Sequence, residues 1–374
     1  MWGIRSSSFG WELGSRKSVM SVGHPISPDN SPHHATLIVS GGILQLVGQF
    51  AALAAAGSPD SVDVVLTGAY GAERRQWVEQ HLQAWLSWRD RGDRWLSPEA
   101  AASQPYRRVL INVEWQAKQR QFLSNRPETW ICGDSLGFYY RQRDEVQACL
   151  QSLLELSLRS RSSRQRRYVL SHRPCWYNHP PQRWQWVAPQ FYRQIWQDYQ
   201  QFCWHATEFP QQWQAATEHL PQDLDPILLL LPNLLPQLRQ PEDFWLLLTD
   251  WCQPLLKTPR PVLLKLHPRF KALDVADWIA AQDWCDRIQC LPESLGGYPA
   301  ELMIAALRQS GWQPTVYSLS TANVNSRLLL NWPCRSFSLR SLRPYRGSWQ
   351  RWLHLRLHWA RIQAAERSLQ SLEP

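Results

Sequence analysis

The chain lacks the cysteine patterns that mark a disulfide scaffold or a zinc module. Its eight cysteines are scattered over 374 residues, and no two of them form a C-x-x-C pair. Small secreted scaffolds place many cysteines in a short chain, whereas cytosolic proteins keep their thiols reduced. We therefore expect reduced thiols and a cytoplasmic protein.

Long apolar runs are also missing. Residues 43–56 span one helix but include two glutamines, and residues 227–235 are interrupted by Pro232. Neither run approaches the roughly 20 apolar residues that a membrane-spanning helix needs. Residues 1–32 contain no continuous apolar segment of a signal peptide. We expect a soluble protein that contacts a membrane only peripherally, at its inner face.

Positive charge is unevenly distributed. The net charge is +9, from 40 basic and 31 acidic residues, and arginines concentrate at 159–167 and again at 335–367. Such patches attract anionic membranes, nucleic acid or phosphorylated ligands, and are as often ordinary solvated faces. Because no nucleic-acid-binding module accompanies the charge, we expect no nucleic-acid partner.

Length and composition favour two globular domains. A chain of 374 residues with 44% hydrophobic and 19% charged residues exceeds one typical core but has enough apolar residues for two. The 23 tryptophans far exceed ordinary usage, and no function follows from them.

Strand and helix patterns alternate twice along the chain. Apolar runs predict strands at 36–39, 62–67, 109–113 and 129–132, and a second series at 227–231, 262–265 and 315–317. Helix-length crossovers between them imply parallel sheets with helices on both faces. We expect an α/β fold of two Rossmann-like domains whose parallel sheets face a central cleft. The expected parts are a disordered segment at 1–34, a first domain with an irregular linker region at 35–225, a second domain at 226–345, and a basic helix at 346–374 that packs back on the first domain.

Polar motifs follow three of these strands directly. They are Gly-Asp-Ser-Leu-Gly at 133–137, Lys-Leu-His-Pro-Arg at 265–269, and Ser-Leu-Ser-Thr-Ala-Asn at 318–323. Ligands of an open parallel sheet bind at the carboxyl ends of its strands. The three motifs therefore predict one active site shared between the two halves.

His267 is the sharpest candidate. Pro268 restricts the preceding residue to an extended backbone, which holds the imidazole at the strand end. With Lys265 nearby, His267 is suited to bind and protonate a departing phosphate oxygen. The alternative is a strand-terminal histidine that hydrogen-bonds a backbone carbonyl.

The other candidates have equally ordinary alternatives. Asp134 between two glycines fits a general base acting on a sugar hydroxyl, or a turn aspartate. Ser320 and Thr321 fit a phosphate cradle at a helix start, or helix caps. Glu301 follows Pro299 and Ala300, which open a predicted helix. It fits an acceptor for ribose hydroxyls, or an acid that complements the helix dipole.

Taken together, these motifs resemble those of bacterial sialyltransferases of GT-B architecture, including polysialyltransferase-like proteins. That family carries an acidic motif, an H-P motif and a Ser-Ser/Thr motif in this order. Asp134 matches the second acidic position, His267-Pro268 the H-P motif, and Ser320-Thr321 the hydroxyl pair. Ser40-Gly41-Gly42 resembles the first strand-to-helix turn of the family, a nucleotide-cleft turn. Gly133 and Ser135 replace the first acid and the glycine of the acidic motif.

The resemblance implies an inverting transferase that moves sialic acid or a related nonulosonate from a CMP donor to a glycan hydroxyl of a cell-surface polysaccharide. Asp134 would be the general base. The donor would be bound by His267 on the phosphate, by Lys265, Pro268, Ser320 and Thr321, and by Glu301 on the ribose. The first domain would receive the acceptor and the second would bind the nucleotide sugar, with no cofactor beyond this co-substrate.

We expect no metal site. Asp223 and Asp225 form a D-x-D string, but they precede a predicted strand instead of following it. His172, Cys175 and His179 lie close together without a fourth ligand. Two alternatives remain open from the sequence: a transferase for another sugar nucleotide, and a non-catalytic membrane-surface binding protein.

Overall fold

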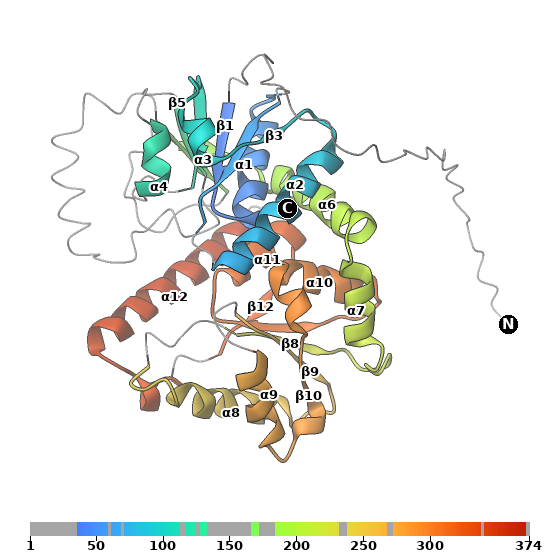
Figure 1. Ribbon diagram of the computed structural model, residues 1–374. Helices are drawn as coiled ribbons and strands as arrows, with labels where there is room; N and C mark the ends of the chain where they lie inside the picture. Colours follow the sequence, from blue (N-terminus) through green and yellow to red (C-terminus); the bar gives the residue numbers. More distant parts are fainter. Residues whose placement is uncertain are drawn as a thin grey trace. The chain divides into compact units, whose positions relative to one another are not determined.

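A computed structural model describes most of the chain, and within it residues 34–374 form one compact unit. The described residues are 36–58, 61–68, 71–112, 117–123, 128–132, 166–171, 184–231, 238–267, 272–337 and 340–371. They fold into two separate parallel β-sheets with helices packed around them (Figure 1). The prediction of two Rossmann-like α/β sheets is confirmed, and the exact domain boundaries stay a prediction.

The first sheet has seven strands in the order β3-β2-β1-β4-β5-β6-β7, and every neighbouring pair is parallel. Its central strands are continuous apolar runs because a parallel sheet is covered on both faces. The strands are β1 (Thr36–Ser40), β2 (Asp63–Leu66), β3 (Arg94–Trp95), β4 (Arg108–Ile111), β5 (Glu128–Cys132), β6 (Arg166–Leu170) and β7 (Trp184–Trp186). The helices in this half are α1 (Ile43–Ala55), α2 (Ala72–Arg89), α3 (Pro98–Ala102) and α4 (Ala117–Arg120), with a 3-10 turn η1 (Gln121–Leu123).

The second sheet has five parallel strands in the order β10-β9-β8-β11-β12. They are β8 (Ile227–Leu230), β9 (Val262–Lys265), β10 (Ile288–Cys290), β11 (Thr315–Ser318) and β12 (Cys334–Arg335). The helices are α8 (Asp243–Leu255), α9 (Ala272–Ala280), α10 (Ala300–Gln309) and α11 (Ala322–Leu330), with 3-10 turns η4 (Cys285–Arg287), η5 (Glu293–Gly297) and η6 (Arg343–Tyr345). The predicted basic helix is present as α12 (Trp349–Gln370), which packs against α11. Its packing on the first half stays a prediction.

Two further helices, α6 (Pro189–Ala206) and α7 (Phe209–Thr217), connect the sheets along the chain. Helix α6 contacts both α1, which follows the first strand, and α11, which follows β11. A second contact joins α2 to the segment after η5, where Trp77 lies edge-on to Tyr298 with ring centroids 5.1 Å apart. A Cβ on Gly297 would lie 2.8 Å from the Trp77 ring, so this approach requires glycine.

The sequence pattern missed strands β6 and β7. The arginines at 159–167 gave no strand pattern, yet Arg166 and Arg167 lie in β6. Arg167 forms an ion pair with Glu128 on the neighbouring strand, with 3.1 Å between Nε and Oε1. Charged residues in a strand are stabilised by a cross-strand partner, and a partner 39 positions earlier leaves no local pattern.

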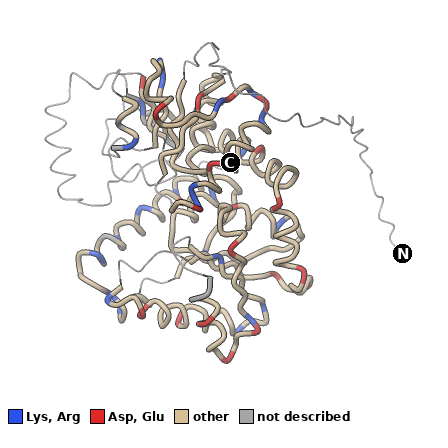
Figure 2. Tube along the Cα trace, viewed as in Figure 1, with Lys and Arg blue, Asp and Glu red and all other residues tan. Residues whose placement is uncertain are grey.

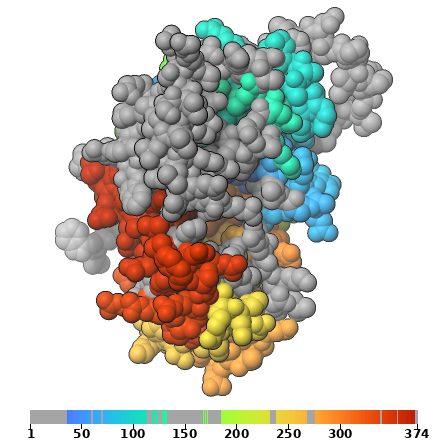
Figure 3. All heavy atoms as spheres, turned by 90° about the vertical axis from the view of Figure 1, so that its left-hand side faces the viewer, coloured from blue at the N-terminus to red at the C-terminus, as the bar shows by residue number. Residues whose placement is uncertain are grey.

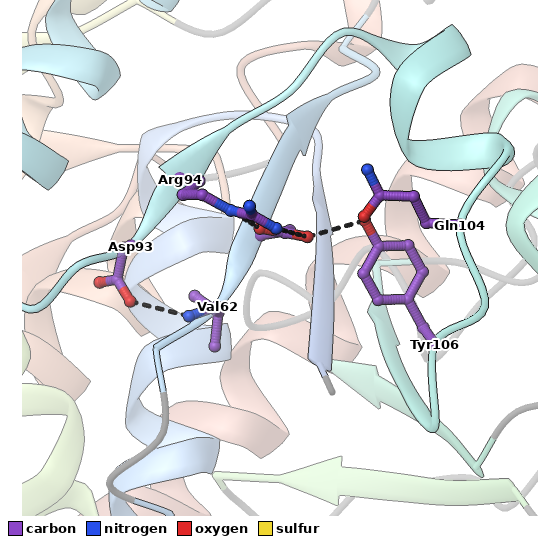
Figure 4. A network of polar contacts seen from close by, with 6 residues as sticks. Val62, Asp93, Arg94, Gln104 and Tyr106 are labelled. Carbon is purple, nitrogen blue, oxygen red and sulfur yellow. Dashed lines mark hydrogen bonds and ion pairs between the residues drawn. The ribbon is translucent and has the colours of Figure 1, made fainter. Parts of the chain in front are cut away.

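A buried polar network holds the amino ends of the first sheet (Figure 4). Asp63, the fully buried first residue of β2, accepts two hydrogen bonds from the guanidinium of Arg94, at 2.9 and 3.1 Å. The Tyr106 hydroxyl donates to the same carboxylate at 2.9 Å. Nearby, the Val62 N–H donates to Asp93 at 3.0 Å. This network ties β2 and β3 to the segment before β4, at the opposite strand ends from the candidate site.

None of the helices in the described part of the chain is long and apolar enough to cross a membrane.

Candidate functional site

A cavity of about 330 Å³, here called the cleft cavity, lies at the carboxyl ends of strands from both sheets. Residues from the start of α1 and from α2 line one side of it. The other side is lined by the ends of β8 and β9 and by the starts of α10 and α11. The predicted cleft between the sheets is thus present where parallel sheets bind ligands.

Most of the predicted site residues meet in this cavity. It is lined by Gly42, Lys265, His267, Glu301, Ser320 and Thr321. Ser40 and Gly41 come directly before Gly42, and the Ser40 hydroxyl donates to the Gly42 carbonyl at 2.9 Å. Asp134 and Pro268 lie outside the described residues, as does the His172, Cys175 and His179 group. Their roles stay predictions.

Three helices of the described part begin at the cleft cavity. They are α1 after Gly42, α10 after Pro299, and α11 after Thr321. The first turns of α1 and α11 contain no acidic residue. A helix N-terminus carries a partial positive charge, so it favours an anion. In α11 the first N–H groups already donate to Ser320 and Thr321, so this helix acts through its dipole. Their meeting at one cavity favours a phosphate or another anion there.

The turn before α11 is held by serine hydroxyls. Ser320 Oγ accepts a hydrogen bond from the Ala322 N–H at 3.2 Å and lies 2.9 Å from Ser318 Oγ. Ser320 therefore closes the turn one residue before the N-cap of the helix, while it also lines the cavity. Thr321 occupies the N-cap position without a capping hydrogen bond from its side chain. Its hydroxyl belongs to the cavity wall.

Lys265 brings a buried positive charge to the cavity. It ends β9, is 8% exposed, and its Nζ donates to the Leu295 carbonyl at 3.4 Å. Burial, and after it the nearby charge of Arg74, lower the pKa of Lys265 to about 8 against the opposing effect of Glu301. The ammonium group is therefore charged near neutral pH but poorly solvated, and a bound anion would restore what burial removes.

Arg74 is a site residue that the sequence did not reveal. It lies in the first turn of α2, lines the cleft cavity, and donates from Nη1 to the Gly296 carbonyl at 3.3 Å. Its neighbour Arg75 forms an ion pair with Glu79 on the same helix, at 2.8 Å. The sequence does not distinguish the two arginines, because the difference between their surroundings comes only from the packing of α2 across the cleft.

Glu301 lies in the first turn of α10 and is 2% exposed. It lines the cleft cavity and lies close enough to Lys265 to raise the pKa of that lysine. A buried carboxylate at a helix N-terminus is stabilised by the helix dipole and by a nearby cation. The position fits both alternatives from the sequence, since the same carboxylate lines the cavity and complements the dipole.

A second cavity of about 470 Å³, here called the side cavity, adjoins the first. The two share Arg74, Lys265 and His267. The side cavity adds the indole of Trp77 and the carboxylates of Glu73, Glu208 and Glu293. His267, half-buried at the end of β9, lies at the junction of an anion-favouring cavity and one with aromatic and acidic walls.

The D-x-D string has a structural role. Asp225 Oδ1 accepts a hydrogen bond from the Gln313 N–H at 2.6 Å, just before β8 and β11 begin. It therefore lies at the amino ends of the strands, away from both cavities. Within the described ranges, no group of three or more His, Cys, Asp or Glu side chains is arranged to hold a metal ion.

Comparison with known proteins gives little further information. No family model matches the chain, and no curated protein matches it. Among solved structures, ADP-heptose lipopolysaccharide heptosyltransferase II of E. coli is similar, with 12% identity and a TM-score of 0.41 over 90% of this chain and 98% of that one. WaaG, a glycosyltransferase involved in lipopolysaccharide biosynthesis, is similar with 11% identity and a TM-score of 0.30, over 90% and 95%. At these scores the similarity carries no conclusion about function.

Proposed function

We propose that the protein is a glycosyltransferase of GT-B type that uses a nucleotide-activated sugar. The observation that carries the proposal is the meeting of three helix N-termini with Lys265, Arg74 and His267 in one cavity at the strand ends of both sheets. Such a cavity suits a phosphate that leaves with developing negative charge, because its donors are fixed before the reaction.

The chemistry follows from these groups. An acceptor hydroxyl attacks the anomeric carbon while the bond from that carbon to the phosphate oxygen breaks, which inverts the configuration. Lys265, Arg74 and the partial positive charge of the α11 N-terminus stabilise the phosphate as its charge grows, and His267 binds or protonates the departing oxygen. The hydroxyl proton goes to a general base, a role that the resemblance gives to Asp134.

The side cavity is suited to the nucleoside. Its carboxylates can accept hydrogen bonds from ribose hydroxyls and from an exocyclic amine, and Trp77 offers an aromatic edge. Glu301, on the cleft side, is the ribose-binding candidate of the resemblance. A donor with its phosphate in the cleft cavity and its nucleoside in the side cavity would have His267 at the phosphate between them.

The finer proposal is a CMP-activated sialic acid or related nonulosonate as the donor and a glycan as the acceptor. It is supported by the order of the three motifs along the chain and by the fit of a monophosphate to a site of fixed cations. Another sugar nucleotide is the second candidate, because the described walls would accept any nucleoside with a free ribose and amine.

The test is a binding panel followed by turnover. We expect CMP to raise the melting temperature of the full chain more than UDP, ADP or GDP, since a ligand stabilises the folded state by mass action. CMP-sialic acid should release CMP, slowly even without an acceptor. Substituting His267→Ala and, separately, Asp134→Asn should abolish turnover, whereas Arg75→Gln should leave it unchanged.

The outcomes distinguish the choice of donor from the transferase activity itself. A larger shift in melting temperature with another nucleotide would show that the donor is not a CMP sugar, and the proposal of a glycosyltransferase would stand. If no nucleotide binds and no nucleotide sugar is consumed, the transferase proposal fails and the non-catalytic alternative stands.

A further inference from the structure

The first turns of α12 expose two large apolar side chains. Trp349 is 69% exposed and Leu353 is 39% exposed. They are four residues apart, so they lie on one face of the helix, and Arg356 continues that face one turn further. The opposite face is buried in the protein through Leu355, Trp359, Ile362, Ala365 and Leu369. Helix α12 is therefore anchored on one side and presents an apolar and basic face on the other.

The charge around this face has one sign. No Asp or Glu occurs between Arg340 and Ala365. Arg343, Arg346 and Arg356 are exposed, and none of the three pairs with an acidic residue of the described chain. The first turn of α12 also contains no acidic residue, so the helix dipole adds to the positive potential. We call Trp349, Leu353 and these three arginines the α12 face.

The neighbouring helix places one carboxylate beside it. Helix α8 contacts η6, where the Tyr345 hydroxyl donates to Asp250 at 2.7 Å and fixes the position of that charged carboxylate. Figure 3 shows α12 in red on one face of the molecule, with α8 in yellow below it. Blue segments recur along α12 in Figure 2. The α12 face is thus on the surface, and its arginines outnumber the acid identified beside it.

We propose that the α12 face docks on an anionic lipid bilayer. Trp349 and Leu353 enter the headgroup region, and the arginines bind lipid phosphates. Indole rings favour the membrane interface because one part is apolar and the N–H stays hydrated. Leucine adds apolar area that a nucleic acid cannot use by stacking, so the pairing of Leu353 with Trp349 favours lipid. This inference is independent of the proposed transferase activity.

The experiment is vesicle co-sedimentation of the full chain. Vesicles of phosphatidylcholine with about 30% phosphatidylglycerol provide the anionic surface, and pure phosphatidylcholine vesicles are the comparison. We expect binding to the anionic vesicles that weakens with salt. Because each arginine near such a surface contributes a factor of roughly five, Arg346→Gln with Arg356→Gln should lower the partition coefficient roughly 25-fold. Trp349→Gln with Leu353→Gln should lower it at all salt concentrations.

Trp186→Gln is the matched control, because Trp186 is 52% exposed on β7 and outside the α12 face. It should bind vesicles like the unchanged chain. The melting temperature of each variant checks folding, and these exposed positions should not alter it. Equal binding by the arginine variant would overturn the proposal. So would the absence of binding to the anionic vesicles. Tight, arginine-dependent binding of a labelled DNA or RNA oligonucleotide would then assign these arginines to nucleic acid.

Discussion

If the cleft binds a nucleotide phosphate as proposed, Lys265 should make that affinity depend on pH in a defined way. Its pKa of about 8 in the folded, ligand-free protein reflects burial first and the charge of Arg74 second. If only the charged form binds the phosphate, about nine-tenths of the protein is competent at pH 7 and about one-tenth at pH 9. The dissociation constant should therefore rise about tenfold over this range.

Two lysine substitutions test how much Lys265 contributes to the affinity. Lys265→Met removes the ammonium group and should raise the dissociation constant near pH 7 by roughly 30-fold, from about 2 kcal/mol for a hydrogen bond to a charged group. It should also flatten the pH dependence. Lys257→Met removes an exposed lysine remote from the cleft and should do neither.

Calorimetric titration with the nucleotide of largest thermal shift is the assay. Binding near pH 8 should take up about half a proton, because the bound phosphate restores the pKa of Lys265. Loss of affinity cannot be mistaken for unfolding, because burial lowers the pKa of Lys265 in the folded protein below its ordinary value of 10.5. The unfolded chain then holds the extra proton, and the ligand-free protein gains stability between about pH 8 and pH 10.5 while it loses affinity. A dissociation constant that stays flat in the unchanged chain, or the same slope in Lys265→Met, would refute this reasoning.

Three other predictions concern single side chains. Arg74→Gln should weaken nucleotide binding roughly 10-fold or more in the same titration, whereas Arg75→Gln should not, and equal effects would remove Arg74 from the site. Burial lowers the pKa of His81 to about 4, so the unfolded chain takes up its proton first on acidification. Stability should fall by up to about 3 kcal/mol from about pH 6.5 to pH 4, and urea titrations of His81→Phe should lack this slope. Asp63→Asn should lower the free energy of unfolding by about 3 kcal/mol, because it breaks a buried pair with Arg94, and should leave the nucleotide dissociation constant unchanged. A change in affinity would show that the amino-end network reaches the cleft.

The central strands and the site residues that follow them were predictable from the sequence. Strands such as β8 and β9 are unbroken apolar runs, and each polar motif begins where the run stops, so Lys265 and His267 mark a strand end. The short strands β3, β10 and β12 have two or three residues and no readable period. Tertiary pairing alone makes them strands.

Arg74 was missed for a different reason. Nothing within ten residues of it differs from an ordinary solvated helix start, and its role depends on residues more than 190 positions away, at Lys265 and Gly296. The motif resemblance likewise predicted most of its site residues in the second half of the cleft. In the first half it predicted only Asp134 and the turn at Ser40-Gly41-Gly42. Contacts across the cleft are set by packing, and local patterns do not record them.

The three helix starts at the cleft cavity have a consequence for how the site would respond to mutation. Their share of the positive potential comes from peptide groups, which every amino acid except proline supplies equally. Replacing side chains one at a time should therefore leave a residual affinity for phosphate below which no alanine variant falls. A proline or an inserted residue in the first turn of α11 should lower the phosphate affinity below this residual value, because it disturbs the peptide groups themselves.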